Sequence, residues 1–454
     1  MVRIRDTLVR DTVELTPREP GKLSMYVCGP TVYDAPHIGN ARTAVVFDTI
    51  RRYLEWAGFD VTYVSNVTDV EDKIIARAAA EGRTEPEVAA EFEDVYFDQI
   101  SRLNVREADH RPHATEYIDR MLDLICALVD RGHAYEVPGR GVYFAVETFD
   151  GYGALPHRSL EELRESAGAR VDVDDAKRSP MDFALWKAAK PGEPAWDSAW
   201  GPGRPGWHIE CSAMALDLLG DGFDLHGGGD DLAFPHHENE RAQACAAGHD
   251  FARHWIHAGM VTIGGDKMSK SLGNFTTVAE ALSAHDARAV RLAMLQTQYR
   301  RAADLGPSEL TAAAKAIERL DAGFRRAEAA GVPSGIAADV ATVDRFRAAM
   351  DDDFDTAHAL AVIFEAAREA NRLIDDSALD QAAPHLRAVD ELLGVLGLEA
   401  HGDDDDDEQI DALVRARDDA RAARDFARAD AIRDQLTELG VQLEDTPSGT
   451  IWHR

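Results

Sequence analysis

The chain has 454 residues, of which 45% are apolar, so it is long enough for about two to four globular domains. No apolar run reaches the ~18 residues of a membrane span and the first residues form no apolar signal core, which argues against a membrane protein and predicts a cytoplasmic one. The four cysteines are too few for a disulfide scaffold and favour thiols or metal ligands.

Acidic residues dominate the charge, because 82 Asp and Glu face 49 Lys and Arg, which gives a formal net charge of −33. A GC-rich genome would explain abundant arginine, but it would not explain the acid excess. Hydrated carboxylates keep a protein soluble in molar salt, where the Debye length falls to ~3 Å and self-repulsion is screened. The composition therefore predicts a protein from a halophile.

Residues 1–114 are expected to form the first half of a parallel α/β sheet. Residues 22–29 are apolar and β-prone, a helical pattern runs to residue 57, and residues 60–67 are again β-rich. This is a β-α-β unit, so the loop after the first strand lies at the carboxyl edge of the sheet. We expect a phosphate-binding loop there.

A separate insertion is expected over residues 115–200, with a helix over 116–131 and a short β segment at 141–146. Apolar and glycine-rich motifs return over 201–260 and indicate the second half of the same sheet. The predicted fold class is therefore α/β, with a Rossmann-like doubly wound sheet that an insertion splits.

Helices are expected after the sheet. A loop and stem-contact region is predicted over 261–305 and a helical bundle over 306–400, in which Ile317, Leu320 and Phe324 share one face. The run 401–408 has no apolar residue and predicts a solvated acidic linker. Over 409–454, a helical stripe followed by a strand, a turn and a strand predicts a small α+β module.

Two short motifs have residues suited to binding phosphate groups. The first is HIGN, His37 to Asn40, at the start of the first long helix, where free N–H groups and a partial positive charge can bind polyphosphate. The second is KMSKS, in which Lys267 and Lys270 lie in a glycine-flanked loop and could neutralise charge on a leaving pyrophosphate. Taken alone, the first could be a helix cap and the second an exposed basic loop.

Together, a HIGH-like element and a KMSKS loop 230 residues later resemble the paired signatures of class I aminoacyl-tRNA synthetases. Within that class, YVCGPTVYD, GWHIECSAM, HGGGDDLAFPHHENE and LEDTPSGTIW resemble the cysteinyl-tRNA synthetase family over nearly the whole chain. The resemblance implies a monomeric enzyme that activates L-cysteine with ATP and Mg²⁺ and transfers it to tRNA(Cys), releasing AMP and pyrophosphate. His37, Asn40, Lys267 and Lys270 would stabilise the phosphate charge.

A metal site is indicated in part by spacing. His236 and Glu240 are four residues apart, which on a helix places an imidazole and a carboxylate on one face, although a charged surface helix would show the same spacing. No spacing rule links Cys28 to Cys211. It is the resemblance that implies one Zn²⁺ held by Cys28, Cys211, His236 and Glu240.

Zinc would explain how cysteine is selected. Serine differs from cysteine by one atom, which an ordinary pocket discriminates only ~10–200-fold, whereas Zn²⁺ binds thiolate and ionises a coordinating thiol. Four protein ligands make a closed site, so the substrate would enter as a fifth ligand or displace one. The remaining cysteines, Cys126 and Cys245, match no ligand position and are expected to be packing thiols.

The resemblance also implies the substrate contacts. Those to cysteine are Cys28, Gly29, Thr68 and Trp207, and those to ATP are Thr31, His37, Asn40, Gly229, Asp231 and Lys270. Glycines at 227–229 would let the backbone approach the nucleotide, and Asp231 could accept from the ribose hydroxyls. Asn40 stands where the family signature usually has histidine, so it can donate a hydrogen bond but carries no charge.

The bundle and the C-terminal module are expected to bind tRNA. Arginine suits phosphate and base-edge contacts, although interleaved aspartates could pair with these side chains instead. The arginines of the module are Arg415, Arg417, Arg421, Arg424, Arg428 and Arg433.

Two other functions share many of these features. One is a mycothiol-type ligase that joins cysteine to an amino sugar, and the LEDTPSGTIW module disfavours it. The other is an inactive zinc- and RNA-binding paralogue, whose signature motifs should be broken. Only Asn40 deviates here.

Overall fold

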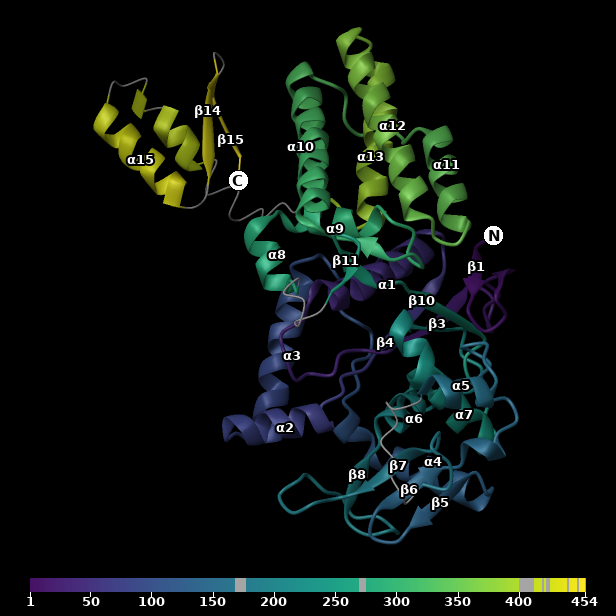
Figure 1. Cartoon of the computed structure of the whole chain (residues 1–454). Coiled ribbons are helices and arrows are strands. Elements are labelled where there is room, and N and C mark those ends of the chain that lie inside the picture. The colour runs from purple at the N-terminus through teal and green to yellow at the C-terminus, as the bar shows by residue number, and fades with distance from the viewer. Residues whose placement is uncertain are drawn as a thin grey trace. The chain divides into compact units, whose positions relative to one another are not determined.

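The computed structural model describes residues 1–167, 177–268, 275–399, 412–418, 420–421, 425–438, 441–446 and 449–453. They belong to two compact units, Met1–Glu399 and Ala400–Arg454, whose helices and strands are labelled in Figure 1. No helix in the described part of the chain is both long and apolar enough to span a membrane.

The larger unit is built on a sheet of four parallel strands in the order β10-β9-β3-β4. The strands are β3 (Lys22–Val27), β4 (Asp60–Ser65), β9 (Leu225–Gly229) and β10 (His254–Ala258). The first two come from the N-terminal half of the unit and the last two from the C-terminal half, and β3 pairs directly with β9. The predicted split, doubly wound parallel sheet is confirmed.

Helix α1 (Ile38–Trp56) connects β3 to β4 and packs on the sheet. Its buried side chains include Val45 and Phe47. Gly227 of β9 has no room for a side chain, since a Cβ there would lie 2.2 Å from the Phe47 ring. The glycine therefore lets α1 lie directly against β9. Because α1 follows β3, its N-terminus lies at the carboxyl edge of the sheet.

An antiparallel sheet in the order β5-β6-β7-β8 lies in the chain between the two halves. Its strands and adjoining helices are α4 (Ile118–Asp130), β5 (Ala134–Val137), β6 (Gly141–Phe144), α5 (Leu160–Ala167), β7 (Phe183–Ala188) and β8 (Gly203–Pro205). The last strand passes the boundary expected at residue 200, because Trp186 and Lys187 of β7 pair with Pro205 and Arg204.

Helices dominate the rest of this unit, and α10 to α13 form the expected bundle (Figure 1). Ile317 and Leu320 are buried and Phe324 packs against them, as their spacing predicts. The remaining elements are β1 (Arg3–Asp6), β2 (Asp11–Glu14), α2 (Asp72–Glu81), α3 (Glu85–Ser101), α6 (Trp207–Leu219), α7 (Glu238–Ala247), β11 (Val261–Ile263), β12 (Asp266–Lys267), α8 (Val278–Ala284), α9 (Ala287–Leu295), β13 (Ala303–Asp304), α10 (Pro307–Ala330), α11 (Val340–Asp351), α12 (Thr356–Asp375) and α13 (Leu379–Val395).

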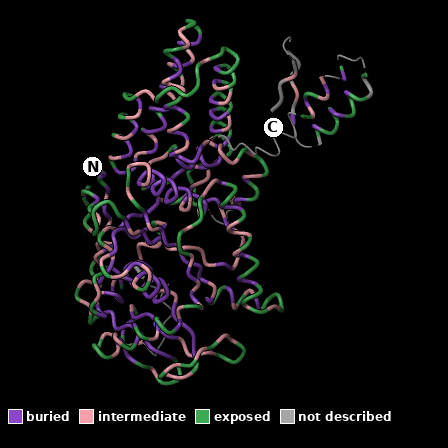
Figure 2. The backbone as a smooth tube through the Cα atoms, turned by 180° about the vertical axis from the view of Figure 1, so that it is seen from behind, coloured by how far each residue is buried: buried purple, intermediate pink, exposed green. Residues whose placement is uncertain are grey.

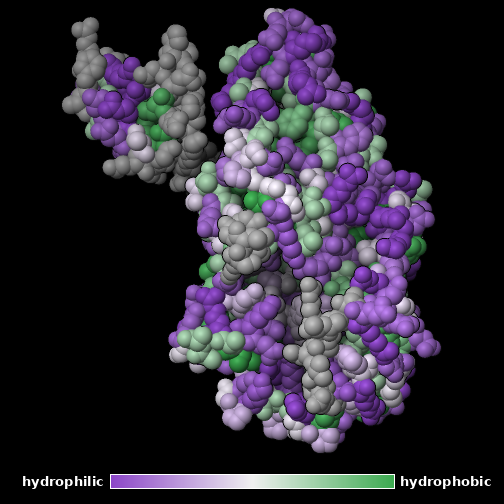
Figure 3. Space-filling model, in the orientation of Figure 1, coloured by the Kyte–Doolittle hydropathy of each residue, from purple (hydrophilic) through white to green (hydrophobic). Residues whose placement is uncertain are grey.

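One apolar core runs from the central sheet into the bundle, and Figure 2 shows buried residues throughout both. The face in Figure 3 is largely hydrophilic. Among the described residues, the exposed large apolar side chains are Met1, Val9, Met260, Ile336 and Val340. They are scattered along the chain, as is normal for a globular surface.

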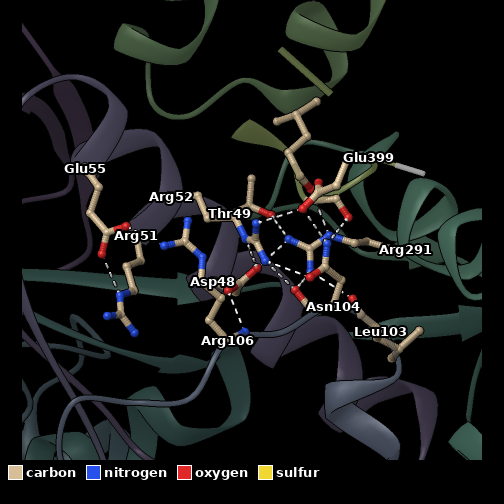
Figure 4. A network of polar contacts seen from close by, with 12 residues as sticks. Asp48, Thr49, Arg51, Arg52, Glu55, Leu103, Asn104, Arg106, Arg291 and Glu399 are labelled. Carbon is tan, nitrogen blue, oxygen red and sulfur yellow. Dashed lines mark hydrogen bonds and ion pairs between the residues drawn. The ribbon is translucent and has the colours of Figure 1, made fainter. Parts of the chain in front are cut away.

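A buried polar network joins α1, α9 and the end of the bundle (Figure 4). Arg291 donates to Asp48 Oδ2 at 2.5 Å and to the carbonyl oxygens of Leu396 and Leu103 at 2.8 and 2.9 Å. Arg52 donates to the same Asp48 oxygen at 2.8 Å. Burial alone would raise the pKa of the Asp48 carboxyl, but the guanidinium groups of Arg291 and Arg52 hold it below its usual value. The network therefore keeps an ionised carboxylate inside the protein.

The smaller unit contains α15 (Phe426–Glu438) and an antiparallel hairpin of β14 (Gln442–Thr446) and β15 (Gly449–His453). Val414, Ile432, Leu436 and Val441 form its core. The predicted helix and strand pair are present. The acidic run 401–408 lies outside the described residues, as does Leu439, which follows Ile432 and Leu436 at helical spacing in the sequence.

Candidate active site and metal centre

The carboxyl edge of the central sheet brings together side chains that are far apart in sequence. Cys28 and Gly29 follow β3, Thr68 lies three residues past β4, and Gly229 ends β9. In parallel sheets this edge is where ligands bind. The candidate site is therefore built from both halves of the split sheet.

Cys28, Cys211, His236 and Glu240 form a metal quartet, with one ligand atom from each lying within 4.8 Å of the others. The two Sγ atoms are 3.6 Å apart, which is too far for a disulfide. Glu240 Oε1 lies 3.4 Å from Cys28 Sγ and 3.0 Å from His236 Nε2. Two thiols, an imidazole and a carboxylate are the donor types of tetrahedral zinc sites. The donor set fits Zn²⁺.

Burial governs the charge of this quartet. Glu240 is fully buried, and His236 and Cys211 are each 1% exposed. Burial raises the pKa of the Cys28 and Cys211 thiols and lowers the pKa of His236. Without a cation, burial therefore favours neutral thiols. A divalent ion bound to the two sulfurs would displace their protons and hold them as thiolates.

The backbone between His236 and Glu240 differs from the single helix expected from their spacing. His236 lies in the short helix η5 (Ala233–His237), and α7 begins only at Glu238. Phe234 inside η5 has extended backbone angles, φ −145° and ψ 131°, so the chain bends just before the pair. The contact between the two side chains nevertheless forms across the junction.

Trp207, the first residue of α6, borders the quartet. Its indole stacks on the His236 ring with centroids 4.0 Å apart. His208 Nδ1 lies 2.9 Å from His236 Nδ1. Burial lowers the pKa of His208 to about 3, so His208 is a neutral imidazole. These two neighbours fix the plane of the His236 ring.

Sequence reasoning missed three histidines behind the quartet. His226 Nε2 lies 2.8 Å from Glu240 Oε2. His237 Nδ1 lies 2.8 Å from His257 Nε2, and Thr7 Oγ1 is 2.8 Å from His257 Nδ1. His226 and His237 stand inside the motifs HGGGDDL and FPHHENE, which drew attention for their glycines and for His236. The available signal was that His226 stands in an apolar, glycine-rich strand and His237 directly beside His236.

A second hydrogen-bonded group follows β4. Asn66 Oδ1 accepts from the Gly29 N–H at 3.0 Å, and Thr68 Oγ1 donates to Glu210 Oε2 at 3.0 Å. Thr68 also forms a β-bridge with Thr31. A Cβ at residue 29 would lie 1.7 Å from the Asn66 carbonyl oxygen, so only glycine fits there. Gly29, Thr31 and Thr68 are neighbours, whereas the sequence did not reveal Asn66 and Glu210.

His37 is the N-cap of α1. Its Nδ1 accepts from the N–H groups of Gly39 and Asn40 at 3.1 and 3.2 Å. Asn40 Oδ1 in turn accepts from the His37 N–H at 3.1 Å, which completes a capping box. Asn40 thus uses its carbonyl oxygen in this cap. The cap uses His37 Nδ1 and sets the direction of Nε2.

The chain that follows KMSKS packs on HIGN. Thr277 forms a β-bridge with His37, and the rings of Phe275 and His37 meet edge to face with centroids 5.4 Å apart. Within the described residues, Met268 and the segment 275–277 therefore lie beside HIGN. Lys267 is exposed at the end of β12, whereas Lys270 lies outside the described residues.

Gly229 and Asp231 lie where β9 meets the short helix η4 (Asp230–Leu232). A Cβ on Gly229 would lie 2.5 Å from Asp231 Oδ1 and 3.8 Å from Thr43 Oγ1 of α1. The missing side chain lets the carboxylate fold back over the strand end. An acceptor at this edge suits ribose hydroxyls.

The expectation of a packing role for Cys126 is wrong. Cys126 is exposed, whereas Met121, Leu124 and Leu128 form the buried face of α4. The helix is amphipathic, and residue 126 falls on its outer side. Cys245 is half-buried and packs against the core, as expected.

The arginines of the smaller unit differ in their surroundings. Arg417 is 8% exposed and donates to Thr450 Oγ1 at 2.7 Å, so its guanidinium group supports the hairpin. Arg433 pairs with Asp430 and Asp434 at 3.0 and 3.3 Å, which is the intrahelical alternative. Three others are exposed, Arg415, Arg421 and Arg428. Arg424 lies outside the described residues.

Comparison with known proteins places three matches in order along the chain. They are the tRNA synthetases class I (C) catalytic domain over residues 14–315, the DALR domain over 345–400, and the cysteinyl-tRNA ligase anticodon binding domain over 403–452. The chain belongs to the cysteinyl-tRNA synthetase family. The cysteine–tRNA ligase of Geobacillus thermodenitrificans is 48% identical over 465 residues, which cover 100% of this chain and 99% of that protein. That of Halorhodospira halophila is 49% identical over 464 residues and covers 100% of both.

The architecture of this cysteinyl-tRNA synthetase family member is shared with solved class I synthetases. Mycobacterium tuberculosis methionyl-tRNA synthetase in complex with methionyl-adenylate aligns with a TM-score of 0.61 and 18% identity, over 83% of this chain and 90% of that one. At this identity the likeness shows the fold alone.

Proposed function

We propose that the chain activates L-cysteine with ATP to cysteinyl-adenylate and transfers the cysteinyl group to tRNA(Cys), releasing AMP and pyrophosphate. The observation that carries this is the buried metal quartet, which lies at the same edge of the sheet as the N-terminus of α1. A thiol-selective donor set and a helix end that binds polyphosphate suit a reaction between a thiol amino acid and ATP. Membership of the family supports the same reaction.

In the first step the cysteine carboxylate attacks the α-phosphate of ATP and the bond to pyrophosphate breaks. The His37 ring and the positive end of the α1 dipole attract the phosphate oxygens, with Asn40 keeping the turn in place. Lys267 and Lys270 stabilise the charge on the leaving pyrophosphate, which carries Mg²⁺. No side chain acts as a covalent nucleophile.

Selection of the amino acid depends on the quartet, whose four residues would hold one Zn²⁺. When bound, Zn²⁺ supplies a Lewis acid that favours thiolate over the much less acidic hydroxyl of serine. Gly29, Thr68 and Trp207 line the amino acid pocket, and Thr31, Gly229 and Asp231 bind the nucleotide. Gly29, Thr31, Thr68, Gly229 and Asp231 end or follow strands of the central sheet, and Trp207 begins α6 beside His236.

In the second step a terminal ribose hydroxyl of tRNA attacks the adenylate carbonyl and AMP leaves. We assign the bundle over 306–400 and the module over 409–454 to tRNA binding, in a monomeric cytoplasmic enzyme. The match to an anticodon binding domain over 403–452 favours tRNA over an amino sugar as the acceptor.

Cysteine-dependent exchange of pyrophosphate into ATP tests the first step, and charging of purified tRNA tests the second. We expect both with cysteine and neither with serine as the control. Exchange without charging would point to the amino-sugar ligase, and the absence of exchange in zinc-loaded protein would point to an inactive paralogue.

A further inference from the structure

Glu210 is a buried carboxyl to which the proposed reaction gives no task. It lies on α6 next to Cys211 and is fully buried. Its Oε2 accepts from Thr68 Oγ1 at 3.0 Å, while its Oε1 has no hydrogen-bond partner among the described residues. Burying a carboxyl with one unpaired oxygen costs free energy, so stability alone does not account for this residue.

Thr68 lies between this carboxyl and the segment that follows β3. Its N–H donates to the Pro30 carbonyl at 3.0 Å, and its own carbonyl accepts from the Val32 N–H at 3.3 Å. These bonds fix the Thr68 backbone beside Gly29 and Thr31. Its position is therefore set before any ligand binds.

The Thr68 hydroxyl already makes two of its three possible hydrogen bonds. A threonine hydroxyl has one proton and two lone pairs. The proton is directed at Glu210 Oε2, and one lone pair accepts from Asn66 Nδ2 at 3.4 Å. One lone pair remains. With Glu210 in place, Thr68 can accept a hydrogen bond from a ligand but cannot donate one.

Cysteine has three polar groups. The carboxylate only accepts hydrogen bonds, and in the proposed function the thiol binds at the quartet. The α-ammonium group only donates hydrogen bonds, so it is the group that suits an acceptor. We propose that Glu210 is a positioning residue that fixes Thr68 Oγ1 as an acceptor for the α-ammonium group of the substrate. This inference rests on the proposed function, which already places Thr68 in the amino acid pocket, and it adds the residue that orients the Thr68 hydroxyl.

Two truncated ligands separate the ammonium from the other groups. Cysteamine keeps the thiol and the ammonium, whereas 3-mercaptopropionate keeps the thiol and the carboxylate and lacks the ammonium. Both are to be measured as competitive inhibitors of cysteine-dependent pyrophosphate exchange. The variants are Glu210→Met, which removes the acceptor at similar size, and Glu210→Gln, which keeps a carbonyl acceptor.

We expect Glu210→Met to raise the KM for cysteine and the Ki of cysteamine ~10-fold, the scale of one hydrogen bond to a charged group. The Ki of 3-mercaptopropionate, the KM for ATP and the zinc content should stay within about 2-fold. Glu210→Gln should restore most of the lost affinity. Thr68→Val should give the same pattern, and the double variant should lose no more than either single one, because both act on one contact.

A uniform loss for all three thiol ligands, or loss of zinc, would show that Glu210 only supports α6 and would overturn the proposal. Unchanged constants for cysteine and cysteamine would overturn it as well. If Glu210→Met fails to fold, Thr68→Val alone decides, because it leaves the buried carboxyl in place. Wild-type protein without cysteine-dependent exchange would instead refute the proposed function, and the inference with it.

Discussion

His236 is held on three sides before any metal binds. The Trp207 indole stacks on its ring, His208 Nδ1 lies 2.9 Å from its Nδ1, and Glu240 Oε1 lies 3.0 Å from its Nε2. A ligand that is already oriented loses little freedom on binding. We therefore expect the ring to act as a ligand and not as a support for the fold.

Replacing His236 with alanine should lower bound zinc well below one per chain. Cysteine activation should fall by more than ~100-fold, since loss of an outer-shell partner already costs ~10–100-fold, while ATP affinity should change little. Metal analysis and pyrophosphate exchange measure these effects. His358→Ala, an exposed histidine on α12, is the control. Equal losses for cysteine and ATP would mean that the site is only structural.

Lys270 is one of the two KMSKS lysines that we assign to the leaving pyrophosphate. Lys270→Ala should lower the adenylation rate constant ~10²–10³-fold, the scale for removing one group that stabilises transition-state charge, with little change in cysteine affinity. Rapid-quench measurement of adenylate formation tests this. Lys315→Ala on the exposed side of α10 is the matched control. A change confined to substrate affinity would contradict the assignment.

Only part of the site could be predicted residue by residue. Spacing found His236 and Glu240, whereas Cys28 and Cys211 needed the family resemblance because they are 183 residues apart. His226 and Glu210 escaped prediction for a physical reason. A buried polar side chain is explained by partners from other strands, and no local periodicity reports those partners.

At the scale of elements, α1 depends on the absence of a side chain at Gly39. A Cβ there would lie 2.9 Å from His37 Cε1 and Nδ1 and 3.5 Å from Met268 Cε. The glycine thus gives space both to the capping imidazole and to a residue of KMSKS. The two motifs share this point of contact.

Gly39→Ala should push the His37 ring from its cap and raise the KM for ATP, by ~10-fold if one good phosphate contact is lost. Initial-rate kinetics at varied ATP measures the change. Gly394→Ala is the control, because Gly394 lies in α13 with nothing within 4 Å of a new Cβ, and alanine should there be neutral or slightly stabilising. An unchanged KM for ATP would show that the ring keeps its place.

The Arg291 network also acts between elements, because it joins α9 to α1 and to the end of the bundle. Replacing Arg291 with methionine would leave Asp48 buried beside a single remaining guanidinium, that of Arg52. We expect a loss of ~3–5 kcal/mol in the free energy of unfolding, as for other broken buried pairs. Arg345→Met breaks the exposed pair with Glu365 and should cost less than ~1 kcal/mol. Urea unfolding of both variants tests this, and similar small losses would show that the network is incidental.

For the whole molecule the net charge of −33 decides how salt acts. In dilute buffer the protein repels itself and tRNA, whereas molar salt screens both repulsions and leaves hydrophobic burial intact. Aminoacylation and melting temperature should therefore rise from ~0.1 to ~3 M potassium chloride, as the Debye length falls from ~10 to below ~3 Å. An ordinary basic RNA binder responds in the opposite sense. Maxima at the lowest salt would refute the halophilic interpretation.

The fold was predictable where it depends on local pattern. The β-α-β unit of β3, α1 and β4 and the bundle helices follow from hydrophobic periodicity. The pairing of β3 with β9 and the Asp48–Arg291 contact do not, because both join segments about 200 residues or more apart. No sequence pattern in β3 indicates which later strand will pair with it.

The split sheet also sets an order of events during synthesis. Met25 pairs with Leu225, so one edge of β3 has no strand to pair with until a segment 200 residues downstream has been made. At ~5–20 residues per second the ribosome needs roughly 10–40 s to make that stretch. Through this interval the nascent chain exposes an unpaired, apolar strand edge, the kind of surface that aggregates. The metal quartet, whose ligands span residues 28 to 240, cannot be complete until residue 240 has been made, which is after β9.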